Sequence, residues 1–297
     1  MLLIGKPRVR DVTTLAIEAT DVRFLVSERG RVASWGSVEL PEGLVTNGLV
    51  TNPVEMGTIL DELFATQQLN RRRVVTALTG LCSIPRVFNL PKLQASLMAE
   101  TIAREARKEM PLSLDDLYLS WDTLESRGEM QRIYLLGVPR DLMDAQVQAL
   151  EAASIPPYVM DLKPLALIRA VAEPDAIVVN LEHASLDVIL VRAYHPAIMR
   201  TFSLGGDNLS NEARLDRLVN ELVQTTQFYN DSHPNAMIPE GTPLYMTGSL
   251  LVGRDAREYV AVSVAYPVAA NESPLQAPRD LPVAEYMTNL GLAQKKV

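Results

Sequence analysis

Short runs of apolar residues near the amino terminus, separated by polar turn residues, predict an antiparallel meander of strands. The stretch 15–39, LAIEATDVRFLVSERGRVASWGSVE, shows this pattern. A similar pattern returns in AIVVNLEHASLDVILV at 176–191 and PAIMRTFSLGG at 196–206. Because the two halves of the chain begin alike, the sequence predicts a duplicated architecture.

Three longer segments have apolar residues at helical spacing. The first begins at Pro53, where proline suits the first helical position because its missing N–H is not needed there. A long helix is predicted over 207–230 and a closing helix over 283–293. The residues predicted to face inward are Met56, Ile59, Leu60 and Leu63 in the first helix, and Leu215, Leu218, Val219, Leu222 and Phe228 in the second.

The block between these halves alternates in type. It reads as an extended segment (CSIPRVFNLP), a helix (LQASLMAETIAREARKEM), two strands (LYLSWDTLE, RIYLLGVP) and a second helix (RDLMDAQVQALEAASI). This order predicts a small inserted α+β unit with both helices on one sheet face. We therefore expect this block to be an insertion in a chain with two similar halves.

Composition narrows the class of protein. The chain has 297 residues, is 47% hydrophobic and has a mean hydropathy of +0.06, which is typical of a soluble globular protein with a sizeable core. A net charge of −8 argues against nucleic-acid binding. The single cysteine, Cys82, excludes an internal disulfide and fits a reducing cytoplasm. No apolar run approaches the roughly 20 residues needed to cross a bilayer, so we expect a partner to hold the protein at any membrane.

The polar elbow within 176–191 has three interpretations: a phosphate-binding loop, a Ser/His/Asp cluster or a hairpin turn. It contains Asn180, Glu182, His183 and Ser185, with Asp187 just beyond. Neighbours on a hairpin rarely reach the geometry of a nucleophile, a base and its orienting group, so the catalytic cluster is disfavoured. No second histidine or carboxylate stands at metal-ligand spacing around the other histidines, which disfavours a metal site.

Four passages, in their order, resemble the PilM family of actin-like cytoplasmic components of type IV pilus assembly. They are SIPRVFNLPKL with AREARKEMPLSLDDLYLSWDTL, LLGVPRDLMDAQVQALEAASIPPYVMDLKPLALIRA, TFSLGGDNLS and VAEYMTNLGLA, and the likeness covers most of residues 12–294. The resemblance implies an α/β, actin-like (ribonuclease H-like) fold, with two related domains around a cleft and a small inserted α+β subdomain. The implied domains are a first domain at 1–82, the insertion at 83–158, a return to the first domain at 159–175 and a second domain at 176–297. A helical segment usual in the family is missing after TFSLGGDNLS, so we expect a reduced lobe in the second domain.

The resemblance also places a degenerate nucleotide site. In the actin fold, two hairpin turns clasp the ATP phosphates, and close approach of their backbones requires glycine. Thr20 and Glu182 stand where the family has these glycines, and Asn180 replaces an aspartate that would hold Mg²⁺ more strongly. The matching positions are Glu18 and Thr20 in the first turn, Asn180, Glu182 and Ser185 in the second, and Gly205, Gly206, Gly248 and Ser249 around the nucleotide.

From these changes we predict no cofactor and no catalytic residue. The alternative is an actin-like ATP-binding protein or ATPase, with ATP and Mg²⁺, that uses nucleotide state for polymerisation or partner switching. Gly205 and Gly206 have their own alternatives, a backbone approach to nucleotide or a helix-entry turn, and the turn is favoured. No aspartate suited to phosphotransfer stands in the cleft loops, which disfavours a sugar kinase.

In the family the partner is PilN, whose cytoplasmic amino-terminal segment binds a groove between the first domain and the inserted unit. By position, 83–90 and 93–110 would border this groove, with Arg86, Val87, Phe88 and Leu90 as the candidate contacts. The resemblance implies a non-catalytic scaffold in the cytoplasm, held at the inner face of the membrane by a PilN-like protein. A pilus ATPase and self-association are further candidate partners, and a pilus and a secretion system both remain open.

Overall fold

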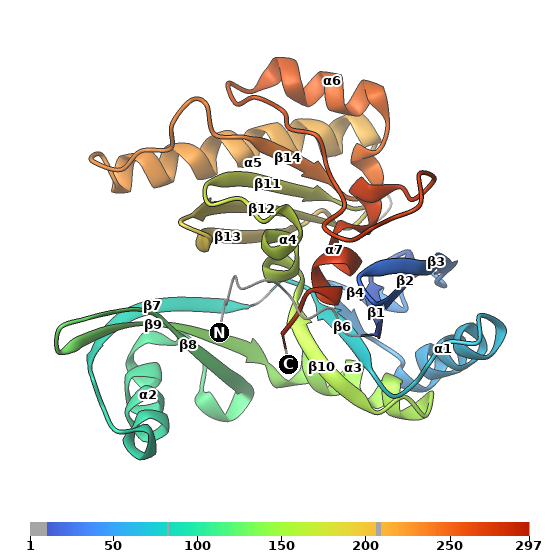
Figure 1. Ribbon diagram of the computed structural model, residues 1–297, viewed down its shortest axis with the longest axis horizontal. Coiled ribbons are helices and arrows are strands. Elements are labelled where there is room, and N and C mark those ends of the chain that lie inside the picture. Colours follow the sequence, from blue (N-terminus) through green and yellow to red (C-terminus); the bar gives the residue numbers. More distant parts are fainter. Residues whose placement is uncertain (1–10, 82, 206–208, 297) are drawn as a thin grey trace.

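The computed structural model describes residues 11–81, 83–205 and 209–296, so Cys82, Gly206 and the predicted helix start at Asp207 lie outside the described residues. Two α/β domains, each built on a mixed sheet, lie one above the other, and a smaller α+β unit extends from one side (Figure 1). Within the described part of the chain, no helix combines the length and apolarity needed to span a membrane.

The first sheet confirms the predicted amino-terminal meander. Its strand order is β10-β6-β1-β2-β3, with β1 to β3 antiparallel and β6 and β10 added in parallel. Every residue of β6 is buried, as expected for a strand covered on both faces. The bounds are β1 (Val12–Ile17), β2 (Asp21–Glu28), β3 (Arg31–Glu39), β6 (Val74–Leu78) and β10 (Pro157–Leu162).

The second sheet repeats this plan in the order β13-β12-β11-β14, which confirms the duplicated architecture. The meander β11 to β13 is antiparallel and β14 pairs in parallel with β11. Where the first sheet has β10, the described second sheet has an isolated bridge between Leu244 and Val268. The bounds are β11 (Ala176–Leu181), β12 (Ser185–Arg192), β13 (His195–Ser203) and β14 (Leu244–Thr247).

The helix α1 (Pro53–Thr66) begins at the predicted proline, and the Asn52 side chain caps it by accepting a hydrogen bond from the Glu55 amide. Its inward residues Met56, Leu60 and Leu63 are buried, as predicted.

The long helix α5 (Asn211–Ser232) starts four residues later than predicted, with Ser210 as its cap. The prediction that Phe228 faces inward is wrong, because its side chain is 59% exposed. The inward positions Leu218, Leu222 and Tyr229 follow helical spacing, and one residue corresponds to about 100° of rotation, so Phe228 is turned away from the core.

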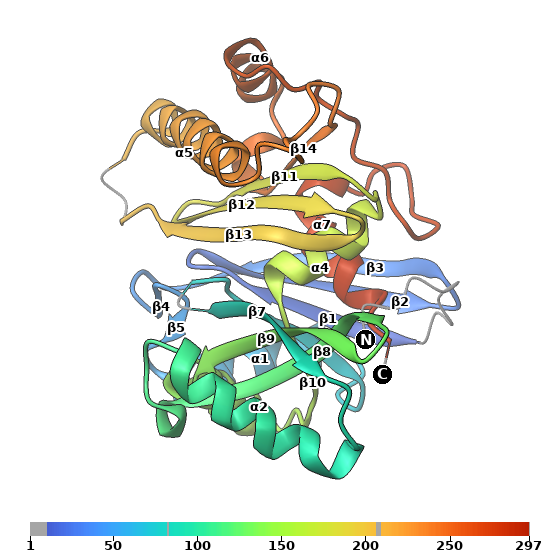
Figure 2. The same ribbon diagram turned by 90° about the vertical axis from the view of Figure 1, so that its left-hand side faces the viewer.

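Two helices, α4 (Lys163–Val171) and α7 (Val283–Ala293), pass between the two sheets (Figures 1 and 2). Their buried side chains form one apolar cluster with residues of both sheets, including Val75 of the first and Val178 of the second. The two domains therefore share a continuous core at this crossing.

The inserted unit contains β7 (Ile84–Pro91), α2 (Ala95–Glu109), β8 (Leu117–Arg127) and β9 (Met130–Pro139), with sheet order β7-β9-β8. Helix α2 covers one face, where Ile102 and Ala106 pack with Ile133 and Leu135. Tyr134 and Leu136 on the opposite face pack with residues of the main body.

The prediction that the second helix of this block also covers the inserted sheet is wrong. Helix α3 (Arg140–Ala152) packs on α1 instead, where Gly57 lies against Ala152. Ala149 and Leu150 belong to the apolar core of the first domain, so this helix uses its apolar residues there and not on the inserted sheet. The domain bounds themselves stay predictions.

Candidate functional site: an interdomain cleft and a lateral groove

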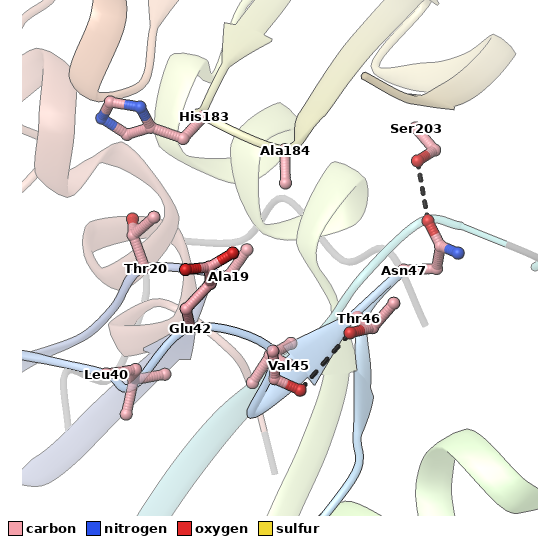
Figure 3. Close-up of a pocket in the computed structure, with 11 residues that line it drawn as sticks. Ala19, Thr20, Leu40, Glu42, Val45, Thr46, Asn47, His183, Ala184 and Ser203 are labelled. Atoms are coloured by element: carbon pink, nitrogen blue, oxygen red, sulfur yellow. Dashed lines mark hydrogen bonds between the residues drawn. The ribbon is translucent and has the colours of Figure 1, made fainter. Parts of the chain in front are cut away.

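The turns that end β1 and β11 face each other across a cavity of about 330 Å³ between the domains (Figure 3). Ala19 and Thr20 come from the first turn, and His183 and Ala184 from the second. The loop at 40–47 forms the rest of the first-domain wall, and Ser203 adds the end of β13. The fold thus brings two of the turns selected from the sequence to one cleft.

Glu182 of the second turn is bound by an arginine of the first domain. The two terminal nitrogens of Arg23 each donate to one carboxylate oxygen of Glu182, at 2.8 Å and 2.8 Å. The Oγ of Ser249 also donates to Glu182, at 2.7 Å. The Arg23 and Glu182 side chains are only 3% and 5% exposed, so this two-pronged ion pair crosses the domain boundary away from solvent.

The Arg23 pair also determines the charge state of Glu182. Burial alone would raise the pKa of this carboxyl, but the hydrogen bonds and charge of Arg23 outweigh burial and hold the pKa below its ordinary value. Glu182 is therefore an ionised carboxylate that is already satisfied by the protein.

A second cation, Lys163, joins the two turns from the start of α4. Its Nζ donates to both oxygens of Glu18 at 3.1 Å and to the Oγ of Ser185 at 3.3 Å, and lies 3.2 Å from Asp187 Oδ2. Burial would lower the pKa of Lys163, but the charges of Asp187 and Glu18 outweigh it and raise the pKa.

Neither Arg23 nor Lys163 is among the candidate site residues predicted from the sequence. One sequence feature could have indicated them. Each is a single basic residue within an apolar stretch, Arg23 in DVRFLV and Lys163 in MDLKPLAL, and a cation buried in such a stretch requires an acidic partner. The same contacts argue against the Ser/His/Asp interpretation, because Ser185 Oγ is bound by Lys163 and Asp187 accepts from Thr201. The elbow is a hairpin turn held by ion pairs.

The buried groups carry three carboxylates, Glu18, Glu182 and Asp187, against the two cations. Burial, together with repulsion from Glu182 and Asp187, raises the pKa of Glu18 to about 7, although Lys163 and Arg23 act in the opposite direction. A proton on Glu18 therefore offsets the excess negative charge near neutral pH.

The first prediction follows from Glu18. Between its ordinary pKa of 4.5 and about 7, the folded state holds a proton that the unfolded state has lost, so stability falls as pH rises through this window. Replacing Glu18 with Gln removes this pH-dependent loss of folding free energy, which is at most about 3 kcal/mol. Chemical denaturation from pH 5 to 8 should give Glu18→Gln a growing advantage over the wild type. The exposed control Glu100→Gln should follow the wild-type slope; a Glu18→Gln curve parallel to wild type would contradict the prediction.

A second hollow of about 420 Å³ lies beside the ion pair and is acidic. Asp21, Glu39 and Glu285 line it together with Arg23 and Ser249. Arg23 also contacts Asp21 at 2.8 Å and Glu285 at 3.4 Å, so its charge is shared among carboxylates. Burial raises the pKa of both Asp21 and Glu285 despite this arginine. This surface would repel a polyphosphate.

The glycines selected from the sequence have mixed environments. Gly248 has φ +98°, and a Cβ there would lie 2.4 Å from the Leu181 carbonyl oxygen, so packing of the chain against itself already requires this glycine. Gly205 has φ +56° with open space around it. Gly206 lies outside the described residues.

A larger groove of about 960 Å³ runs between the first domain and the inserted unit. One wall is the hairpin of β4 (Val45–Thr46) and β5 (Leu49–Val50), and the other includes the junction of β9 with α3. Its lining combines apolar and acidic side chains. The residues are Thr46, Asn47, Leu49, Thr51, Leu112, Asp116, Pro139, Arg140, Asp141, Leu142 and Asp144.

The four partner residues selected from the sequence do not line this groove. They lie on β7, which is the opposite edge of the inserted sheet from β8. Arg86 donates to the Glu109 carbonyl oxygen, while Phe88 and Leu90 pack with the residues beneath α2. Val87 is 43% exposed. The lining could not be predicted from the sequence, because residues 46–51, 112–116 and 139–144 meet only in the folded chain.

Two domains of one topology, joined by crossing helices around a cleft, define an actin-like protein, here with the cleft turns bridged by internal ion pairs. The sequence matches the family model of the type IV pilus assembly protein PilM over residues 10–204. The chain belongs to this family, which confirms the resemblance seen in its motifs. A comparison with curated proteins finds no match.

Solved structures support the fold. A PilM-PilN type IV pilus biogenesis complex matches with a TM-score of 0.79 at 21% identity, covering 96% of this chain and 98% of that one. The ethanolamine utilization protein EutJ from Carboxydothermus hydrogenoformans matches at 0.58, with 13% identity and 99% and 94% coverage. The cytoplasmic domain of EpsL, an inner membrane component of the type II secretion system of Vibrio cholerae, matches at 0.55, with 14% identity and 97% coverage of both chains.

Proposed function

We propose that this chain is a non-catalytic scaffold of type IV pilus assembly. It binds the cytoplasmic amino-terminal segment of a PilN-like membrane protein and is thereby held at the inner face of the membrane. The groove between the hairpin β4–β5 and the inserted unit carries the proposal, because it is the largest of the three hollows described above and an extended segment can enter it. The family match and the similarity to a PilM-PilN complex support a PilN-like partner.

The chemistry of the groove suits a peptide with aliphatic side chains and a basic residue. Leu49, Leu112 and Leu142 supply apolar surface. Asp116, Asp141 and Asp144 outnumber Arg140, and the Arg140 guanidinium stacks on the Tyr118 ring at 4.2 Å. Charge complementarity at such a surface mainly controls specificity and the rate of association.

The cleft supports a role without ATP. In an actin-like cleft the nucleotide joins the two domains, whereas here Arg23 and Lys163 make that connection. A nucleotide would have to displace paired, buried charges, and breaking such a pair from one side costs about 3–5 kcal/mol. The acidic hollow beside the pair adds repulsion toward phosphate.

Calorimetric titration tests the proposal, with a synthetic peptide from the cytoplasmic amino terminus of the same organism's PilN homologue and, separately, with Mg·ATP. We expect micromolar, one-to-one binding of the peptide and no measurable heat from Mg·ATP. Leu112→Glu, at a groove residue that is 47% exposed, should weaken peptide binding at least about ten-fold, because a carboxylate would replace apolar surface that the peptide's aliphatic side chains are expected to contact.

Two control variants locate the binding site. Leu97 is 49% exposed on α2 outside the groove, so Leu97→Glu matches Leu112→Glu in chemistry and exposure and should bind like the wild type. Val87→Glu tests the edge selected from the sequence and should also bind normally. Micromolar Mg·ATP binding without peptide binding would favour the actin-like ATPase instead.

A further inference from the structure

The interdomain cleft and the lateral groove share one wall. Thr46 and Asn47 of the β4–β5 hairpin line both the 330 Å³ cavity and the 960 Å³ groove. Figure 3 shows the Asn47 side chain pointing from this hairpin toward Ser203 at the end of β13. The hairpin therefore contacts the second domain while forming a wall of the groove.

The contact across the domains is a specific hydrogen bond. Ser203 Oγ donates to Asn47 Oδ1 at 2.7 Å. Asn47 and Gly48 form the tip of the hairpin with φ values of +51° and +80°, the backbone of a tight two-residue turn that favours these residue types. The geometry of the turn thus determines where the Asn47 side chain points.

The hairpin also packs against other residues of the first domain. A Cβ on Gly48 would lie 2.1 Å from Thr79 Cγ2, so the tip lies directly against the segment after β6. Val45 and Val50 are buried in the first-domain core together with Ala149 and Leu150 of α3. Leu49, by contrast, lines the groove. A peptide against Leu49 would therefore press on an element whose tip touches the second domain.

We propose that the β4–β5 hairpin couples occupancy of the groove to the contact between the two domains. The coupling rests on the proposed function, since it requires a peptide in the groove. A bound peptide holds the hairpin in the position that forms the Asn47–Ser203 hydrogen bond, and by linkage the hydrogen bond favours the peptide to the same degree. In this protein the peptide, rather than a nucleotide, biases the relative position of the domains.

Ser203 permits a clean test because it is exposed and does not line the groove. Ser203→Ala should weaken the PilN-homologue peptide about two- to five-fold, as expected for losing one exposed hydrogen bond. Ser203→Trp, which places bulk between the hairpin and β13, should weaken it about ten-fold or more. Hydrogen exchange should show that the peptide slows exchange in 200–205 of the wild type and not of either variant.

Ser263 provides the matched control, since it is an exposed serine of the second domain whose Oγ donates to the Tyr259 carbonyl oxygen, also at 2.7 Å. Ser263→Ala and Ser263→Trp should bind the peptide like the wild type. Two results would overturn the coupling but not the proposed function. Either the Ser203 variants bind the peptide like the wild type, or the Ser263 variants weaken binding as much as the Ser203 variants do. Failure of the wild type to bind the peptide would overturn the proposed function and the coupling with it.

Discussion

Replacing Arg23 with methionine is expected to lower the free energy of unfolding by about 3–5 kcal/mol. The substitution leaves Glu182, whose side chain is 5% exposed, without the guanidinium that satisfies both of its oxygens. Asp21 and Glu285 lose the same cation, although both are more exposed and can be hydrated. Urea denaturation followed by circular dichroism would measure the loss.

A double substitution separates two causes of this destabilisation: the unpaired charge of Glu182 and the lost packing of the Arg23 side chain. In Arg23→Met/Glu182→Gln the buried carboxylate is gone, so at least about 2 kcal/mol of the loss should return. The control Arg104→Met removes an arginine that is 69% exposed and pairs with Glu105 on the surface, and it should change stability by less than about 0.5 kcal/mol. A double variant less stable than Arg23→Met would show that packing around Arg23, and not the charge of Glu182, causes the effect.

Gly291→Ala is expected to destabilise the protein by about 3 kcal/mol, because the added methyl has no room at the crossing of α4 and α7. A Cβ on Gly291 would lie 1.9 Å from the carbonyl oxygen of Ala166 and 2.5 Å from its carbonyl carbon. Both neighbours are backbone atoms, so the two helices must separate to relieve the clash. Overpacking of this kind typically costs about 1–3 kcal/mol, and a rigid neighbour moves the cost toward the upper end.

The separation would affect both domains, since α4 and α7 share one apolar cluster with both sheets. Differential scanning calorimetry should therefore show a single transition at lower temperature. Gly241→Ala is the matched control, because Gly241 lies in a turn outside the left-handed φ region and an added methyl there would have no atom within 4 Å. Two separate transitions in Gly291→Ala would mean that the domains do not depend on this crossing.

The two cleft turns, which lack the glycines expected from the family resemblance, are joined by contacts within the chain. Thr20 stands in the first turn, and Glu182 in the second is used as a partner for Arg23 and Ser249. Lys163 adds a connection through Glu18 and Asp187. We therefore expect the contacts between the domains to persist without nucleotide, and we propose the lateral groove as the site at which a partner acts.

The repeated meander, the start of α1 and the hairpin turn between β11 and β12 could all be predicted from the sequence. These features depend on local preferences: alternation of apolar residues in strands, the geometry of proline at a helix start and polar residues between two apolar strands. The orientation of Phe228 and the packing of α3 were predicted wrongly, because one residue of helical rotation and the choice between two apolar surfaces depend on neighbours outside the segment.

The roles of the charged residues, by contrast, are set by the tertiary structure. Arg23 and Glu182 are 159 positions apart, and Lys163 and Glu18 are 145 apart, so nothing local marks them as partners. The groove likewise combines segments from the first domain, the inserted unit and α3. Ion pairing and groove formation depend on distances between side chains in space, and the closing of two sheets around α4 and α7 sets those distances.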